Sequence, residues 1–135
     1  MRTQLEAIAQ TLAREMETTG TIVLDGRTFS KHSMNLSPYA SLCRPAIQKL
    51  ASLVKDNIPK SRVDGVSFII PNGDPFKCSK HVVAVVTTEE GVFRVDPTIR
   101  QYVPNAQMVY ADGEQYPITH YCAGSMRTAT LYNGL

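Results

Sequence analysis

The hydrophobic positions of this chain follow two different spacings. From about Thr3 to Glu17, and again between Cys43 and Pro59, the apolar side chains recur every three or four positions, as on one face of a helix. Beyond Pro59 they alternate with polar residues or form short β-branched runs, which is typical of strands. The pattern therefore predicts helices first and several antiparallel strands afterwards, an α+β fold with the helices packed against one side of a sheet.

The first helix is expected from about Thr3 to Glu17. Thr3 and Glu6 have the spacing of a capping box at its start, and Gly20 suits its stop. Its apolar stripe consists of Leu5, Ile8, Ala9, Leu12, Ala13 and Met16. A stripe of this kind usually faces the protein's own core, so the helix is expected to pack on the body of the domain.

The second helix is located by Pro45. Proline is accepted at the first helical position and removes a backbone hydrogen bond further in, so the helix is expected to begin between Leu42 and Pro45. Cys43 is then at the N-cap or one residue before it. The buried stripe of this helix is Ile47, Leu50, Ala51 and Val54, and Pro59 lies past its end.

The remaining apolar segments predict strands. The expected strands are Thr21–Leu24, Val66–Ile70, Val82–Val86, Val92–Val95, Gln107–Tyr110 and Tyr116–Tyr121, followed by a weakly patterned tail. The polar stretch from Arg27 to Tyr39 is expected to be a long loop. The chain has no internal repeat, and its 135 residues fit a single domain, 1–135.

The apolar runs on either side of Glu89 and Glu90 predict a hairpin that brings a histidine and an aspartate near each other. If these two residues are the loop, counting along the strands places Thr98 opposite His81, and Asp96 two residues from Thr98 on the same face. Such diagonal neighbours lie roughly 7–8 Å apart between Cα atoms, within reach of a carboxylate that bonds an imidazole. A loop one residue longer or shorter puts Asp96 on the other face.

Composition and charge argue against several classes of function. The chain is 43% hydrophobic and 19% charged, as in ordinary globular proteins. Its net charge of +2, from scattered lysines and arginines, does not indicate a nucleic-acid partner. No apolar run approaches the roughly 20 residues of a membrane span, and the start of the chain lacks a signal-peptide core. We therefore expect a cytoplasmic protein, or one secreted as an effector without a classical signal.

Three cysteines, Cys43, Cys78 and Cys122, are an odd number without repeating spacing. This argues against a disulfide framework and favours free thiols. Cys43 is the chemically distinctive one, because unpaired N–H groups and the helix dipole at a helix start favour a thiolate and can also bind an oxyanion.

Cys43, His81 and Asp96 together have the chemistry of a catalytic triad. The thiolate attacks a carbonyl, the imidazole carries protons, and the carboxylate fixes the imidazole tautomer. Each residue alone has an ordinary structural explanation, as a buried thiol, a surface histidine or a turn aspartate. The combination of a helix-start cysteine with a histidine and an aspartate on one hairpin predicts a thiol-dependent enzyme.

The chain also resembles the papain-like and transglutaminase-like cysteine enzymes. The resemblance lies in the helix that begins at Cys43, the run His81-Val-Val-Ala-Val-Val and the run Val95-Asp96-Pro97-Thr98-Ile99-Arg100-Gln101-Tyr102. It spans roughly Ser41 to Val103 and is most similar to compact bacterial papain-fold toxins and glutamine deamidase effectors. The resemblance implies a papain-like core, catalytic roles for Cys43, His81 and Asp96, a protein or peptide substrate and no cofactor. It implies glutamine deamidation first, and peptide cleavage or transglutamination second.

Members of these families often have a small or amide residue beside the nucleophile, where this chain has Leu42. The side-chain donor to the oxyanion must then come from elsewhere. Asn35 and Ser41 are the candidates.

Two other interpretations stay open. Cys78 with His81, and His120 with Cys122, could supply four zinc ligands to a non-enzymatic binding module. That arrangement would claim His81 and so exclude it from catalysis. His32 could instead replace His81 as the base, although it lacks a carboxylate companion on a paired strand.

Overall fold

The computed structural model describes residues 1–31, 39, 42–71 and 80–135 of the chain. Within these residues it has two α-helices, a five-stranded antiparallel sheet and a two-stranded sheet, so the expected α+β class is confirmed. The elements are α1 (Arg2–Thr19), β1 (Thr21–Leu24), β2 (Arg27–Ser30), α2 (Cys43–Asn57), β3 (Ser61–Ile69), β4 (Lys80–Thr88), β5 (Gly91–Val95), the 3-10 helix η1 (Ile99–Gln101), β6 (Val109–Ala111) and β7 (Arg127–Asn133). In this described part of the chain, no helix is long and apolar enough to cross a membrane.

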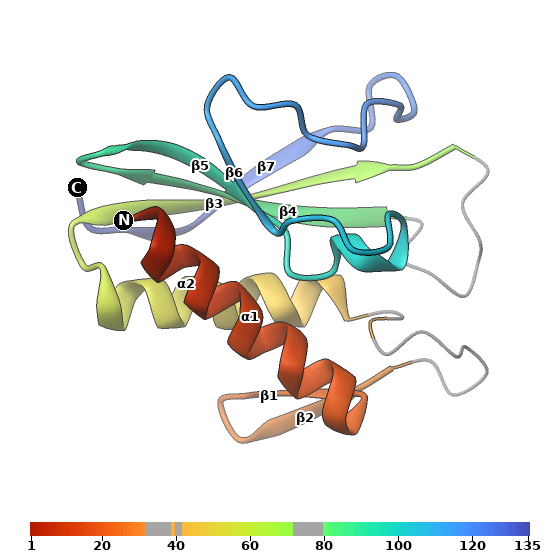
Figure 1. Cartoon of the computed structure of the whole chain (residues 1–135), viewed down its shortest axis with the longest axis horizontal. Coiled ribbons are helices and arrows are strands. Elements are labelled where there is room, and N and C mark those ends of the chain that lie inside the picture. The colour runs from red at the N-terminus through yellow and green to blue at the C-terminus, as the bar shows by residue number, and fades with distance from the viewer. Residues whose placement is uncertain (32–38, 40–41, 72–79) are drawn as a thin grey trace.

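The large sheet has the strand order β6-β5-β4-β3-β7. Both helices lie on one of its faces, and the chain between β6 and β7 crosses the other face (Figure 1). Val63, Val86 and Phe93 are paired neighbours on three adjacent strands, and all three are buried in the same core as the helix stripes. The helices are therefore held on the sheet by burial of apolar surface from both layers.

Helix α1 buries the six residues of its predicted stripe and ends at Gly20. Gly20 has a left-handed φ of 66°, and its N–H closes the last turn with a 2.7 Å hydrogen bond. The expected capping box of Thr3 and Glu6 is wrong, because the helix begins at Arg2 with Met1 as its N-cap and no side-chain cap. Thr3 is thus inside the first turn, and Glu6 pairs with Arg2 instead.

Helix α2 begins inside the predicted window, with Leu42 as its N-cap and Cys43 as its first helical residue. The expectation that Cys43 is at the N-cap or before it is therefore wrong by one position. Pro45 is tolerated two residues later, because N–H groups in the first turn have no acceptor within the helix. The helix ends at Asn57, before Pro59 as predicted, and its predicted stripe is buried.

The expected loop from Arg27 to Tyr39 is wrong in its first part. Residues 27–30 form β2, which pairs with β1 in a small antiparallel sheet. Asp25 and Gly26 join the two strands with positive φ angles of 50° and 77°, the backbone that a two-residue hairpin turn requires. Because β2 is mostly exposed, its polar sequence has no hydrophobic alternation. Residues 32–38, 40 and 41 lie outside the described residues.

The end of the chain also differs from expectation. Residues 116–121 contain no strand, whereas the weakly patterned tail forms β7 on the edge of the sheet beside β3. Pro117 has no N–H to give to a ladder, and Tyr116 directs its side chain to another partner described below. β7 is almost fully exposed, so its residues carry no apolar pattern. The strand expected at 107–110 is present but begins later, as β6.

Candidate active site

Strands β4 and β5 form the predicted hairpin. Thr88 pairs with Gly91 at the end of the ladder, so only the two glutamates between them form the loop. The same register, continued to the other end, places position 98 opposite His81 and position 96 diagonal to it. The side-chain geometry at that end can therefore be compared directly with the prediction.

His81 and Asp96 meet as the register predicts. The Nε2 atom of His81 lies 2.6 Å from Oδ2 of Asp96. Both side chains are 0% exposed, so water does not compete for this bond. A distance this short is typical of a hydrogen bond with a charged partner. With Nε2 directed at the carboxylate, Nδ1 is the ring nitrogen that can exchange a proton with another group.

Cys43 lies directly beside the backbone that leads into His81. Its side chain is 4% exposed, and Sγ donates to the carbonyl oxygen of Lys80 across 3.5 Å. That carbonyl belongs to the peptide bond that joins Lys80 to His81. The start of α2, the start of β4 and η1 lie at the same end of the molecule (Figure 1). The fold thus brings the thiol of Cys43 to the backbone beside His81, and the imidazole of His81 to the carboxylate of Asp96.

No protein-family model, curated protein or solved structure matches this chain. The resemblance to papain-like cysteine enzymes therefore stays an expectation. The chemistry of Cys43, His81 and Asp96 depends on their geometry and on the side chains around them.

Two aromatic rings hold the imidazole of His81. Phe68 of β3 meets it edge-on with ring centroids 5.6 Å apart, and Tyr102 meets it from beyond η1 at 5.1 Å. Edge-to-face contacts at such separations are favourable and fix the plane of a ring. Neither residue was predicted to be part of the site, because their contacts depend on the pairing of β3 with β4 and on the turn into η1.

The carboxylate of Asp96 has further donors. Its Oδ1 accepts from the backbone N–H and the hydroxyl of Thr98, at 3.2 and 3.3 Å. Its Oδ2 accepts from the hydroxyl of Tyr116 as well as from His81. Four donors suit an ionised carboxylate, which has only acceptors to offer. Tyr116 was not predicted to be a site residue: it is twenty positions further along the chain, and no local pattern marks it.

Several predicted candidates lie outside the described residues: Cys78, His32, Asn35 and Ser41. No group of three or more residues able to hold a metal ion occurs among the residues that the structure describes. Of the described candidates for that site, His81 is bonded to Asp96, and the exposed His120 contacts the hydroxyl of Thr119.

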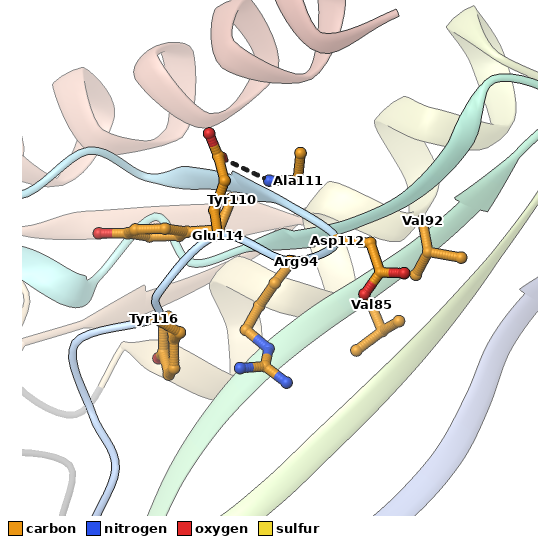
Figure 2. A pocket seen from close by; sticks show the side chains of 9 residues that line it. Val85, Val92, Arg94, Tyr110, Ala111, Asp112, Glu114 and Tyr116 are labelled. Atoms are coloured by element: carbon orange, nitrogen blue, oxygen red, sulfur yellow. Dashed lines mark hydrogen bonds between the residues drawn. The ribbon is translucent and has the colours of Figure 1, made fainter.

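Two hollows lie on the sheet face opposite the helices. The smaller has a volume of about 110 Å³ and lies between β5 and the turn after β6 (Figure 2). The larger, about 390 Å³, extends along β3 and β4 under residues 114–126. Arg94, Glu114 and Tyr116 line both of them. Cys43, His81 and Asp96 are not among the described lining residues of either, whereas Phe68 and Tyr116, which contact His81 and Asp96, line the larger one.

Proposed function

We propose that this chain is a cysteine-dependent enzyme with a papain-like core, which transfers the acyl group of an amide through a thioester on Cys43. Its first candidate reaction is deamidation of a glutamine side chain in a target protein. The observation that carries the proposal is the position of Cys43 Sγ, 3.5 Å from the peptide group that leads into a histidine already bonded to a buried aspartate.

In the first step His81 Nδ1 takes the proton from Cys43 Sγ. The thiol must turn from the Lys80 carbonyl to do this, since it donates there at rest. The product is a thiolate and an imidazolium, and Asp96 stabilises the imidazolium through the proton on Nε2. The start of α2 adds the positive end of the helix dipole, which favours the thiolate.

The thiolate then attacks the carbonyl carbon of the amide, and the carbonyl oxygen becomes an oxyanion. N–H groups of the first helical turn are directed out of the helix, where they can stabilise that charge. Cys43 and Arg44 supply two of them and Pro45 supplies none. When the C–N bond breaks, the imidazolium gives its proton to the leaving nitrogen. For a glutamine side chain, ammonia leaves and a thioester remains.

Water resolves the thioester with His81 as the base. The imidazole takes a proton from the attacking water, the C–S bond breaks, and the resulting imidazolium returns that proton to the thiolate. The glutamine has become a glutamate. An attacking amine in place of water gives transglutamination, and a main-chain amide in the first step gives peptide cleavage. These alternatives share one thioester and differ in what leaves and what attacks.

The proposal is tested by replacing the nucleophile. We expect Cys43→Ala and Cys43→Ser to lower turnover by several orders of magnitude, because each removes the attacking atom. Candidate protein substrates are incubated with the enzyme, and intact mass spectrometry looks for the gain of about 1 Da that accompanies deamidation. Cys122→Ser is the matched control, since it removes a half-buried thiol outside the triad and should leave turnover unchanged.

Full activity of Cys43→Ala would end the proposal. Unfolding of Cys43→Ala, with no thiol reactivity in the wild type, would instead show that Cys43 is a structural residue. Alkylation separates these cases, because a catalytic Cys43 should react much faster than Cys122 at mildly acidic pH.

A further inference from the structure

Tyr116 makes a contact that an ordinary packing residue does not make. Its side chain is 6% exposed, and its hydroxyl donates to Oδ2 of Asp96. The same oxygen accepts the hydrogen bond from Nε2 of His81. Two donors thus divide the charge of one carboxylate oxygen, and one of them is the imidazole of the proposed triad.

The phenol of Tyr116 is a permanent donor. Burial raises its pKa above the ordinary value of 10.0, and the charge of Asp96 raises it further. The hydroxyl therefore keeps its proton well above the pH at which an exposed phenol ionises. A protonated phenol is the donor in a hydrogen bond to a carboxylate, because a carboxylate has only acceptors.

The ring of Tyr116 is held from two sides. The guanidinium of Arg94 lies over it at 4.8 Å from the ring centre, and the ring of Tyr110 meets it edge-on at 5.4 Å. Figure 2 shows Arg94 and Tyr110 on either side of the turn that leads to Tyr116. Both contacts fix the direction in which the hydroxyl is presented.

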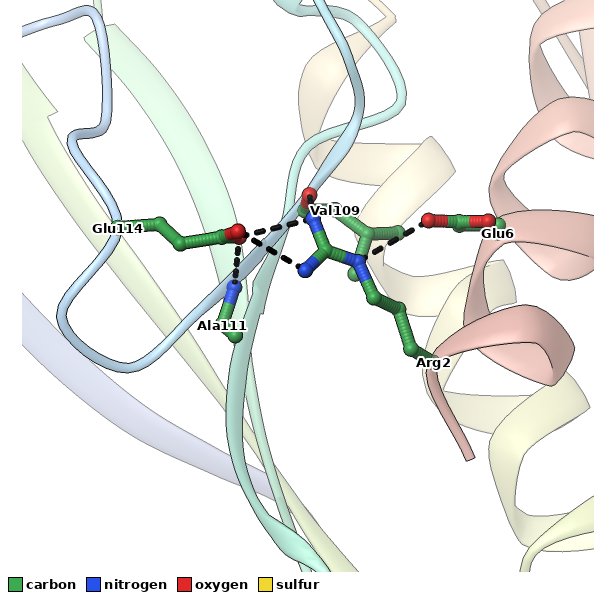
Figure 3. A network of polar contacts seen from close by, with 5 residues as sticks. All are labelled: Arg2, Glu6, Val109, Ala111 and Glu114. Carbon is green, nitrogen blue, oxygen red and sulfur yellow. Dashed lines mark hydrogen bonds and ion pairs between the residues drawn. The ribbon is translucent and has the colours of Figure 1, made fainter.

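The segment that carries Tyr116 is also tied down at the backbone. Glu114 accepts from the guanidinium of Arg2 in α1 and from the N–H of Ala111, as Figure 3 shows. Further along, the N–H of Cys122 bonds the carbonyl of Ile69 in β3 at 2.8 Å. Anchors before and after Tyr116 keep its hydroxyl at Asp96.

We propose that Tyr116 is a positioning residue that moderates how strongly Asp96 holds the proton of His81. By taking part of the carboxylate charge, its hydroxyl weakens the hydrogen bond to Nε2, so that the imidazolium gives up its proton to the leaving group more readily. The catalytic consequence rests on the proposed function, whereas the effect on the bond between Asp96 and His81 does not.

Three other side chains surround the bond between Asp96 and His81. Thr98 donates to the opposite oxygen of Asp96, and Tyr102 and Phe68 offer ring edges to the imidazole. Arg94 and Tyr110 face Tyr116 itself. Of these described groups, only Tyr116 shares an oxygen with His81, so its hydroxyl can be changed without removing another donor to Asp96.

The test is the NMR resonance of the proton on His81 Nε2 in protein labelled with ¹⁵N-histidine. The protein has three histidines, and the signal of His81 is identified as the one that is missing from the spectrum of His81→Gln. In Tyr116→Phe we expect this proton to move downfield, because the whole charge of Oδ2 is then directed at His81. Replacing Tyr116 by 3-fluorotyrosine, a stronger donor of similar size, should move it upfield. Tyr110→Phe is the matched control, because it removes a neighbouring phenol hydroxyl for which no bond to Asp96 is described.

The catalytic readouts follow from the same change. In Tyr116→Phe the alkaline limb of the activity profile should move to higher pH by about half a unit or more, with kcat about tenfold lower and KM unchanged.

An unchanged Nε2 proton in both Tyr116 variants would overturn the inference and make Tyr116 a packing residue. If the proton moves as expected but wild-type protein has no Cys43-dependent activity, the proposed function fails and the inference about the hydrogen bond stands. Should Tyr116→Phe not fold, the fluorotyrosine protein decides alone.

Discussion

At the scale of single residues, Asp96 is the most exacting test of the candidate site. Asp96→Asn keeps the size and shape of the side chain but has only one acceptor oxygen for four donors. His81 therefore loses its preferred tautomer or Thr98 loses its acceptor. We expect turnover to fall by several orders of magnitude with the fold retained, as happens when the orienting acid is removed from related triads. Steady-state kinetics and circular dichroism measure the two effects.

Asp96→Ala should be at least as inactive and also less stable. It leaves the buried donors of His81, Thr98 and Tyr116 without their acceptor, at a cost of about 1–3 kcal/mol for each unsatisfied group. Urea unfolding measures that loss. Near-normal turnover of Asp96→Ala would mean that His81 is not oriented by this carboxylate, and His32→Ala would then be the next variant to assay.

The residues of the site differ in how far sequence alone could locate them. His81 and Asp96 could be placed by counting, because a two-residue hairpin loop fixes which positions face each other. Cys43 could be placed at a helix start because Pro45 limits where that helix begins. Tyr116 could not be found in this way. Its contact depends on the route of a segment without regular structure across the sheet, and no periodicity encodes such a route.

At the scale of elements, the end of α1 gives a test of backbone conformation. Gly20 has a φ of 66°, and an added Cβ would lie 3.2 Å from the flexible side chain of Lys31. The strain of Gly20→Ala is therefore mainly in the backbone, and we expect the free energy of unfolding to fall by about 1 kcal/mol. Gly20→Asn should cost less, since asparagine tolerates the left-handed region better. Urea unfolding that ranks alanine as stable as glycine would contradict this end of the helix.

Elements were predictable where they are buried and missed where they are exposed. The stripes of α1 and α2 and the valine run of β4 have apolar patterns because each packs into the core. β2 and β7 are mostly exposed strands, and burial therefore selects no alternation in them. β2 could have been suggested by Asp25-Gly26 between two short runs, a turn sequence typical of hairpins. β7 has no such local signal, because it joins β3 from the far end of the chain.

At the scale of the whole molecule, the candidate site exists only in the assembled fold. α2 supplies Cys43, β4 supplies His81, and the exit of β5 supplies Asp96, while Tyr116 arrives from the opposite face of the sheet. The hydrophobic core between the helices and the sheet holds α2, which carries Cys43, against the strands that carry His81 and Asp96. Loss of that packing should therefore remove the fast alkylation of Cys43 at mildly acidic pH and the contact between His81 and Asp96 together.

Because this fold buries Tyr116 beside Asp96, the free energy of unfolding should fall at alkaline pH. Burial and the charge of Asp96 raise the pKa of Tyr116 in the folded state, while in the unfolded chain it titrates near 10.0. Below that pH its contribution to stability is fully present. Above it the unfolded state releases a proton that the folded state keeps, so the free energy of unfolding falls, by about 1.4 kcal/mol per pH unit for one such group.

Above pH 10 the free energy of unfolding should accordingly fall more steeply with pH in the wild type than in Tyr116→Phe. Burial and a hydrogen bond to Glu17 raise the pKa of Tyr39 to about 12, so that tyrosine adds to the slope in both proteins between pH 10 and about 12. Tyr116→Phe removes one titrating group and should leave the shallower dependence. Urea unfolding at half-unit steps between pH 8 and about 11.5 measures both slopes. Parallel curves above pH 10 would mean that Tyr116 ionises as easily in the folded protein as in the unfolded chain, which is incompatible with a buried phenol that donates to Asp96.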